Sequence, residues 1–124
     1  MSKLNGVAIL VVEDSAEVNA MLQRFLEADG ATVEVVLNGK EAVAAVARKD
    51  FDLILMDIQM PVMDGYLATQ NIRIQGFRRP IIAVTALAKE EDRHRAIEAG
   101  CDAHVIKPIS RELLLEVVRR YLRR

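Results

Sequence analysis

The chain has 124 residues, of which 52% are hydrophobic and 28% are charged. This length predicts one domain of ordinary size over residues 1–124, and the apolar content suffices for a packed core, which excludes disorder as the main state. Seventeen Lys and Arg residues against 18 Asp and Glu residues give a net charge of −1. The chain therefore lacks an overall basic field for direct binding of nucleic acid or of an anionic membrane.

The single cysteine, Cys101, can form neither an internal disulfide nor a cysteine-based metal site, which fits a reducing compartment. No apolar run approaches the ~20 residues of a membrane span, and residues 1–6 lack the apolar stretch of a signal peptide. We therefore expect a cytoplasmic domain that makes no membrane contact.

Five apolar runs of strand length, rich in Val, Ile or Leu, recur along the chain. They are residues 7–12, 32–37, 51–56, 81–84 and 103–106. Segments with helical spacing lie between them and after the last run, with apolar stripes at 18, 21, 22, 25 and 26 and at 114, 117, 118, 121 and 122. Residues 89–99 form the weakest predicted helix, because their apolar side consists mainly of Ala96 and Ile97.

Capping residues mark the ends of these predicted helices. Four residues are start signals: Asp14 (three residues before Glu17), Asn38 (three residues before Glu41), Asp64 and Ser110. The end signals are Gly30, Gly76 and Gly100.

Strands that alternate with helices over this length predict an α/β fold, a doubly wound parallel sheet of five strands with helices on both faces. Four of the runs are apolar nearly throughout, as strands buried on both faces should be, whereas residues 32–35 alternate as an edge strand does. With the second strand at the edge, the flavodoxin-like order 2-1-3-4-5 is favoured.

In open α/β sheets, ligands bind outside the carboxyl ends of the strands. The first run is followed there by Glu13 and Asp14, the third by Asp57, the fourth by Thr85 and the fifth by Lys107. Three carboxylates repel one another unless a cation joins them, and ligation by oxygen alone selects a hard ion such as Mg²⁺. A carboxylate oxygen at such a site can attack a phosphoryl group while the lysine neutralises charge on the transferred oxygens.

Each of these residues taken alone also has an ordinary explanation. Residues 13–15 fit a helix cap, residues 60–65 a turn, and Lys107 a solvated loop lysine. His94 lies in the charged segment 89–95, which is typical of a solvated helix face, and Arg119, Arg120, Arg123 and Arg124 suit the negative end of a helix dipole. The convergence of four strand ends on one chemistry favours the functional interpretation.

These residues resemble the receiver domains of two-component response regulators over essentially the whole chain. The resemblance rests on four segments that match the family's signatures in order: Val11-Val12-Glu13-Asp14, residues 55–65 from Leu55 to Gly65, Val84-Thr85-Ala86-Leu87-Ala88, and Lys107-Pro108.

The resemblance implies that Asp57 accepts a phosphoryl group from a phosphohistidine. It implies an Mg²⁺ site made by Glu13, through a water, by Asp14 and Asp57, and by the main-chain carbonyl of Gln59. It also implies that Thr85 and Lys107 contact the phosphoryl group, and in this family the Lys107–Pro108 peptide bond is often cis. The implied partner is a sensor histidine kinase or a histidine phosphotransfer domain, and the domain itself would be a monomer or a weak dimer.

Two positions depart from the family pattern. His104 stands where a Tyr or Phe is usual, which alters the expected switch between Thr85 and that ring, and Leu67 stands where a Glu is frequent. We expect the face made by the fourth predicted helix, the fifth strand and the last helix to change on phosphorylation, although a static, solvent-facing His104 is the alternative. The sequence of residues 56–65 is most similar to that of receivers in hybrid sensor kinases, with a stand-alone regulator as the other possibility.

Three alternative functions remain open from the sequence, and whether the chain is an enzyme in its own right is undecided. An aspartyl-phosphate phosphatase of the haloacid dehalogenase type has an Asp-x-Asp motif after its first strand, where this chain has Glu13-Asp14. A flavodoxin-like flavin binder needs a phosphate-binding loop there, but the two carboxylates of this chain would repel a phosphate group. A pseudo-receiver that serves only as an interaction module would not require the full acidic, Asp57, Thr85 and Lys107 set.

Overall fold

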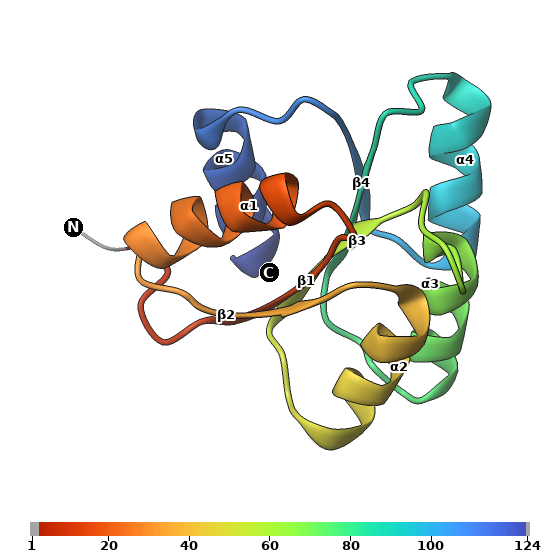
Figure 1. Cartoon of the computed structure of the whole chain (residues 1–124), viewed down its shortest axis with the longest axis horizontal. Helices are drawn as coiled ribbons and strands as arrows, with labels where there is room; N and C mark the ends of the chain where they lie inside the picture. The colour runs from red at the N-terminus through yellow and green to blue at the C-terminus, as the bar shows by residue number, and fades with distance from the viewer. Residues whose placement is uncertain (1–2, 124) are drawn as a thin grey trace.

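The computed structural model describes residues 3–123, in which five strands alternate with five helices (Figure 1). In chain order they are β1 Ala8–Val12, α1 Ala16–Ala28, β2 Thr32–Val36, α2 Gly39–Arg48, β3 Leu53–Asp57, α3 Gly65–Ile74, β4 Ile81–Thr85, α4 Glu90–Ala99, β5 Ala103–Ile106 and α5 Arg111–Leu122. The expectations for residues 1–2 and for Arg124 lie outside the described residues. No helix within the described range is long and apolar enough to cross a membrane.

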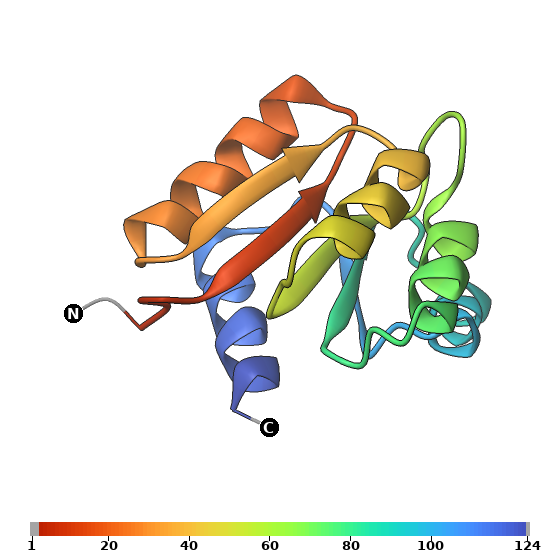
Figure 2. The same ribbon diagram turned by 90° about the horizontal axis from the view of Figure 1, so that it is seen from below.

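The strands form one parallel sheet in the order β2-β1-β3-β4-β5, which confirms the predicted fold class and strand order. Helices α1 and α5 cover one face of the sheet, while α2, α3 and α4 cover the other (Figure 2). The carboxyl ends of all five strands therefore meet at one edge of the molecule, which is where the polar residues were predicted to gather.

The core has two layers because side chains along each central strand alternate between the two faces of the sheet. Leu10 and Met56 pack toward α2, α3 and α4, whereas Val11 and Leu55 pack toward α1 and α5. Strands β1, β3 and β4 are buried almost throughout, as their apolar sequences predicted. These three strands form the rigid platform for the residues at their carboxyl ends.

The edges of the sheet agree with the prediction on one side only. Strand β2 is the expected edge strand. The expectation that the run 103–106 is buried on both faces is wrong: Ala103 and His104 are half-buried and Ile106 is exposed. The physical reason is that an open sheet has two edges, and β5, a strand of four residues, forms the second one.

Helix caps confirm most of the predicted starts. Asn38, Asp64 and Ser110 each accept a hydrogen bond from the main-chain amide three residues later, and Gly30, Gly76 and Gly100 each follow a helix with a positive φ. The predicted cap at Asp14 is wrong. Ser15 caps α1 by accepting from the Val18 amide, because Asp14 belongs to the loop that carries the acidic residues.

Candidate functional site

The sheet brings the predicted site residues Glu13, Asp14, Asp57, Thr85 and Lys107 to its carboxyl edge. Asp57 and Thr85 are the last residues of β3 and β4 rather than the residues after them, while Glu13 and Lys107 directly follow β1 and β5. Glu13, Asp57 and Thr85 are buried, Lys107 is half-buried, and Asp14 is exposed. The site is therefore a small set of desolvated polar groups with one exposed carboxylate at its rim.

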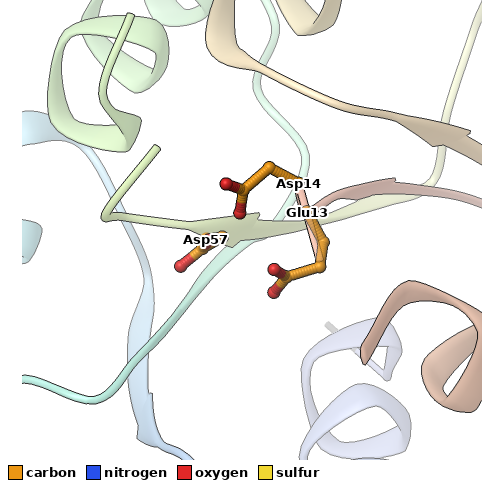
Figure 3. Close-up of side chains that lie close together, drawn as sticks. All are labelled: Glu13, Asp14 and Asp57. Atoms are coloured by element: carbon orange, nitrogen blue, oxygen red, sulfur yellow. The ribbon is translucent and has the colours of Figure 1, made fainter. Parts of the chain in front are cut away.

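Three carboxylates lie together in this site. Glu13 and Asp14 come from the end of β1 and Asp57 from the end of β3, and one oxygen of each lies within 4.8 Å of the others (Figure 3). Glu13 is 2% exposed and Asp57 is 4% exposed, so water screens their mutual repulsion poorly. Oxygen donors that converge in this way fit a hard divalent cation, and this donor set can hold one metal ion.

Lys107 is the cation that faces the buried carboxylates. Its Nζ lies 2.8 Å from Glu13 Oε1 and 3.4 Å from Asp57 Oδ1. Burial alone lowers the pKa of Lys107, but the hydrogen bond to Glu13 and the charges of Asp57 and Glu13 outweigh burial, so its pKa lies above the usual value. The lysine is therefore charged at neutral pH. Lys107 thus contacts two of the three carboxylates.

The Asp57 carboxyl is the group most strongly affected by this imbalance. Its burial, together with the negative charge of Glu13, raises its pKa from 3.8 to about 6, although Lys107 and a main-chain hydrogen bond from Gln59 act in the opposite direction. At neutral pH the carboxyl is ionised at a cost in free energy. An ionised and poorly compensated carboxylate is well suited to gain from a bound cation or to react as a nucleophile.

The loop between β3 and α3 packs closely against the main chain of Asp57. A Cβ atom at Gly65 would lie 2.4 Å from the Asp57 main-chain oxygen, so only glycine lets the start of α3 approach the strand end this closely. The Gly65 amide donates to the Ile58 carbonyl at 2.9 Å and closes the loop. Gln59, whose carbonyl was predicted as a metal ligand, lies within this closed loop, two residues after Asp57.

Thr85 and His104 lie on neighbouring strands, as expected. The Thr85 hydroxyl is buried and accepts a hydrogen bond from the Leu87 amide at 3.1 Å. His104 pairs with Ala83 in the register of β4 and β5, two residues before Thr85 on the same face of the sheet. The His104 Nε2 atom is buried and has no hydrogen-bond partner among residues 3–123, so the ring is turned partly inward.

Two groups that position Glu13 were missed by the sequence analysis. The Ser15 amide donates to Glu13 Oε2 at 3.0 Å, and Asn19 Nδ2 donates to the Glu13 main-chain oxygen at 3.3 Å. Both come from the start of α1, so the helix fixes the peptide that carries the acidic pair. The position of Asn19, one turn into the helix that follows the acidic pair, is the only signal that could have indicated this contact.

Residues that the sequence analysis placed outside the site lie away from it. His94 is exposed on α4 and lies 3.3 Å from Glu90. Cys101 is buried, and burial raises the pKa of its thiol to about 11. Arg119 does more than complement the dipole of α5, because it binds both oxygens of Asp29 at the end of α1, at 2.7 and 3.3 Å.

Comparison with known proteins decides the family. The model of the response regulator receiver domain matches residues 9–119. The chain belongs to this family. Among solved structures, the receiver domain of the sensor histidine kinase PA1611 from Pseudomonas aeruginosa is 38% identical, with a TM-score of 0.89 over 96% of this chain and 99% of that one. That receiver holds a magnesium ion in its active-site cleft. CheY4 from Vibrio cholerae is 30% identical, with the same TM-score over 93% of this chain and 98% of that chain.

Curated relatives place this receiver domain close to those of hybrid kinases and of response regulators. It is 39% identical over 133 residues to probable histidine kinase 2 from Oryza sativa, covering 93% of this chain and 13% of that protein. It is 35% identical over 122 residues to the transcriptional regulatory protein TcrA from Mycobacterium tuberculosis, covering 98% of this chain and 48% of that protein. The chain thus spans less than half of these two relatives.

Proposed function

We propose that this receiver domain, taken as one domain over residues 1–124, accepts a phosphoryl group on Asp57 from a phosphohistidine. A carboxylate oxygen of Asp57 attacks the phosphorus atom, a P–O bond forms, the P–N bond to the histidine breaks, and the released imidazole takes up a proton. The observation that carries this proposal is the buried Asp57 carboxyl, whose pKa is raised to about 6 beside Glu13 and Lys107. Receiver family membership supports it.

The donor set favours Mg²⁺ as the metal of this site. Asp14 and Asp57 would bind it directly, Glu13 through a water, and Gln59 through its main-chain carbonyl. When bound, Mg²⁺ supplies positive charge that offsets the repulsion among the carboxylates and on the transferred phosphoryl oxygens. The magnesium in the active-site cleft of the PA1611 receiver supports the choice of ion.

Lys107 and Thr85 would contact the phosphoryl group once it is attached. Lys107 already lies 3.4 Å from Asp57 and would neutralise a phosphoryl oxygen. The Thr85 hydroxyl would leave the Leu87 amide and donate to a second oxygen. This movement would free space beside β4 for the His104 ring, so the face made by α4, β5 and α5 would change.

The phosphoryl source is a sensor histidine kinase or a histidine phosphotransfer domain, located in the cytoplasm. Receiver domains of hybrid kinases and of separate regulators are both among the relatives. We favour a hybrid-kinase receiver, in which the phosphoryl group passes from this domain to a phosphotransfer partner, and the domain acts as a monomer or weak dimer.

Phosphorylation by a small donor tests the proposal. Incubation with acetyl phosphate or phosphoramidate should add one phosphoryl mass to the intact protein in the presence of Mg²⁺ and much less without it. Asp57→Asn keeps the size of the side chain but removes the nucleophile, so the added mass should vanish. Asp64→Asn, at the exposed cap of α3, is the matched control and should be phosphorylated normally.

Stoichiometric phosphorylation of the Asp57→Asn variant would overturn the assignment. Absence of phosphorylation in the wild type by both donors and by a phosphohistidine protein would favour the pseudo-receiver, an interaction module without phosphotransfer. Multiple turnover of simple phosphomonoesters would favour a phosphatase instead.

A further inference from the structure

Helix α4 is held to the rest of the molecule very unevenly. Its buried residues are Ala96 and Ala99, both in its second half, whereas residues 90–95 are charged or polar and mostly exposed. Lys89 at the cap position offers no side-chain oxygen to the helix amides, and its own amide donates to Asp92 at 3.1 Å. Little apolar surface therefore fixes the first half of α4.

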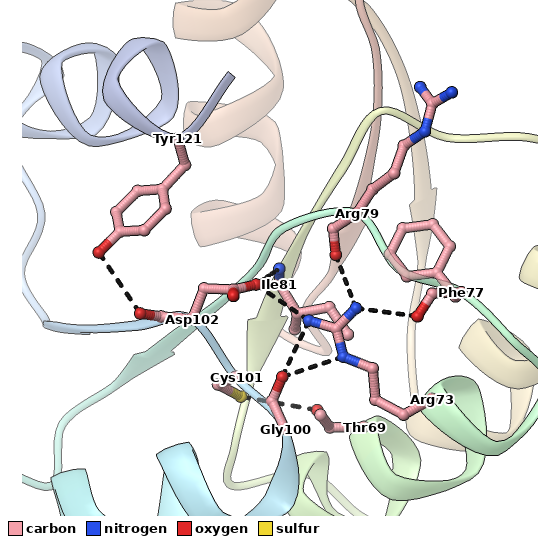
Figure 4. A network of polar contacts seen from close by, with 9 residues as sticks. All are labelled: Thr69, Arg73, Phe77, Arg79, Ile81, Gly100, Cys101, Asp102 and Tyr121. Carbon is pink, nitrogen blue, oxygen red and sulfur yellow. Dashed lines mark hydrogen bonds and ion pairs between the residues drawn. The ribbon is translucent and has the colours of Figure 1, made fainter. Parts of the chain in front are cut away.

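Arg73, at the end of α3, binds the opposite end of α4. Its Nε and one terminal nitrogen donate to the Gly100 carbonyl at 3.0 and 2.9 Å, and that terminal nitrogen also reaches Asp102 at 2.9 Å (Figure 4). The other terminal nitrogen donates to the carbonyls of Phe77 and Arg79 at 3.0 and 2.7 Å. These are five hydrogen bonds, as many as the guanidinium has N–H groups.

The backbone of Gly100 packs closely against the side chain of Arg73. It ends α4 with a φ of 118°, a left-handed conformation that favours glycine. A Cβ atom there would lie 2.9 Å from Cγ of Arg73. The end of α4 therefore packs directly on the arginine stem, and this contact is both polar and close.

Two buried polar atoms lie on the side of the sheet that α2, α3 and α4 cover. The Tyr66 hydroxyl and His104 Nε2 have no hydrogen-bond partner within the described residues 3–123. Arg95 of α4 covers the Tyr66 ring at 4.3 Å, and His104 lies beside Ala83, which shares a core cluster with Ala96 and Ala99. Buried polar atoms without partners destabilise the closed state, so opening of α4 toward water recovers part of that cost.

We propose that Arg73 is the pivot of α4, so that the helix opens from its Lys89 end while its Gly100 end stays attached to α3. The free end is joined through residues 86–89 to Thr85, so the pivot determines which part of α4 can follow a change at the site. This last link depends on the proposed phosphorylation of Asp57, whereas the pivot itself is a property of the unphosphorylated protein.

Hydrogen exchange followed by NMR, without any phosphoryl donor, tests the pivot. In the wild type, the Gly100 and Cys101 amides, which donate to Ile97 and Ala96, should be protected well beyond the Arg93 amide. Arg73→Lys keeps the charge but loses most of the five bonds. It should speed exchange at Gly100 and Cys101 by at least about tenfold beyond the change at core amides of β1 and β3.

Arg119→Lys is the control, since it weakens a second arginine, which binds both oxygens of Asp29 and joins α5 to the end of α1. It should lower protection of all slowly exchanging amides together and preserve the gradient along α4. If Arg73→Lys does not fold, Asp102→Asn weakens one of the five bonds and should give the same selective effect to a smaller extent. Uniform exchange along wild-type α4, or equal effects of the two arginine variants on Gly100, would overturn the pivot.

Beryllofluoride, a phosphoryl mimic, separates this inference from the proposed function. With Mg²⁺ and the mimic, amide shifts should change over residues 86–95 and remain nearly fixed at 99–102. Large shifts at 99–102 would contradict the pivot. No shifts anywhere would contradict phosphoryl binding at Asp57, and the exchange gradient would then decide the pivot independently.

Discussion

At the amino-terminal end of the strands, Asp52 and Asp102 accept hydrogen bonds from the first amides of β1 and β4, at 2.8 Å from Ala8 and 2.9 Å from Ile81. Each of the two carboxylates also has its own arginine, Arg79 for Asp52 and Arg73 for Asp102. At the carboxyl end, Glu13 and Asp57 share one lysine, Lys107, and Asp14 lies close to both carboxylates. Acidic side chains therefore stabilise the fold at one end of the sheet and destabilise it at the other.

The carboxylates at the amino-terminal end stabilise the fold, whereas those at the carboxyl end are suited to bind a ligand. Backbone amides and guanidinium groups are permanent partners, so the amino-terminal end is complete without any added ion. The carboxyl end lacks enough positive charge until a cation or a phosphoryl group changes the balance. Removal of one carboxylate from each end should therefore have opposite effects on stability.

The largest effect is expected at the amino-terminal end. Asp102→Ala removes the carboxylate that pairs with the Arg73 guanidinium and leaves the Ile81 amide without its acceptor in a partly buried place, so the free energy of unfolding should fall by about 3 kcal/mol. Urea unfolding at neutral pH measures this loss. Asp102→Asn retains an acceptor oxygen and should lose less.

The matched control for this prediction is Asp50→Ala, which removes an exposed carboxylate in the loop between α2 and β3 and should change stability by less than about 0.5 kcal/mol. Equal losses in Asp50→Ala and Asp102→Ala would remove the distinction between the two ends of the sheet.

The effect at the carboxyl end should have the opposite sign and depend on pH. The pKa of Asp57 is about 6 in the folded protein and near 3.8 as a free side chain. As the pH rises from about 4 to 6, the unfolded chain gives up this proton first, so the native state loses stability, and the loss is complete above about pH 6. Without Mg²⁺, Asp57→Asn should therefore be more stable than the wild type at pH 7.5 by about 2–3 kcal/mol.

Denaturant unfolding in EDTA at pH 7.5 and pH 4 provides the measurement for Asp57→Asn. At pH 4 the wild-type carboxyl is mostly protonated, so the two proteins should be nearly equal in stability. Added Mg²⁺ should stabilise the wild type and not the variant. A stability difference that is the same at both pH values would show that the charge of Asp57 is not its cause.

The sequence predicted the carboxyl end better than the amino-terminal end, for a physical reason. Glu13, Asp57, Thr85 and Lys107 lie at the ends of strands, and parallel strands bring their ends together whatever the details of packing. The strand order followed from one alternating strand, 32–35, among apolar ones. These features depend on the hydrophobic pattern, which the sequence displays directly.

The amino-terminal network could not be predicted in this way. Arg73 reaches partners up to 29 residues away, and nothing in its neighbourhood in the chain distinguishes it from a solvated arginine in the last turn of a helix. Asn19 presents the same difficulty, because its acceptor is a main-chain oxygen. The exposure of Ile106 was missed since an apolar run looks alike at the centre and at the edge of a sheet.

A smaller effect concerns backbone strain, which also lies at the carboxyl end. Val62 has a φ of 71°, while every other positive φ among residues 3–123 belongs to a glycine. The Met63 amide donates to the Pro61 carbonyl at 2.8 Å, which makes Val62 the centre of a tight three-residue turn. Its side chain is 76% exposed, so no packing compensates for the strain.

Val62→Gly should raise the free energy of unfolding by about 1 kcal/mol, since relief of strain exceeds the greater entropy of glycine in the unfolded chain. Val62→Ala keeps a Cβ atom in the same conformation and should bring little change. Thermal melting of the three proteins distinguishes these outcomes, and a less stable glycine variant would show that the turn is unstrained.

The smallest effect should come from Asn19, which touches no ligand and holds the Glu13 main-chain oxygen at 3.3 Å. Asn19→Ala removes this tether, so the acidic pair samples more orientations and Mg²⁺ binding should weaken by about fivefold, the value of roughly one hydrogen bond. Gln23→Ala is the matched control one turn later on α1, where the side chain bonds only to Glu27 on the surface. Titration of Mg²⁺ followed by amide shifts near Asp57 gives both affinities, and urea unfolding in EDTA should find the two variants similarly stable. Equal Mg²⁺ affinities would mean that the carboxylates of the site are positioned by β1 and β3 alone, whereas a weaker Asn19→Ala would extend the metal site into the first turns of α1.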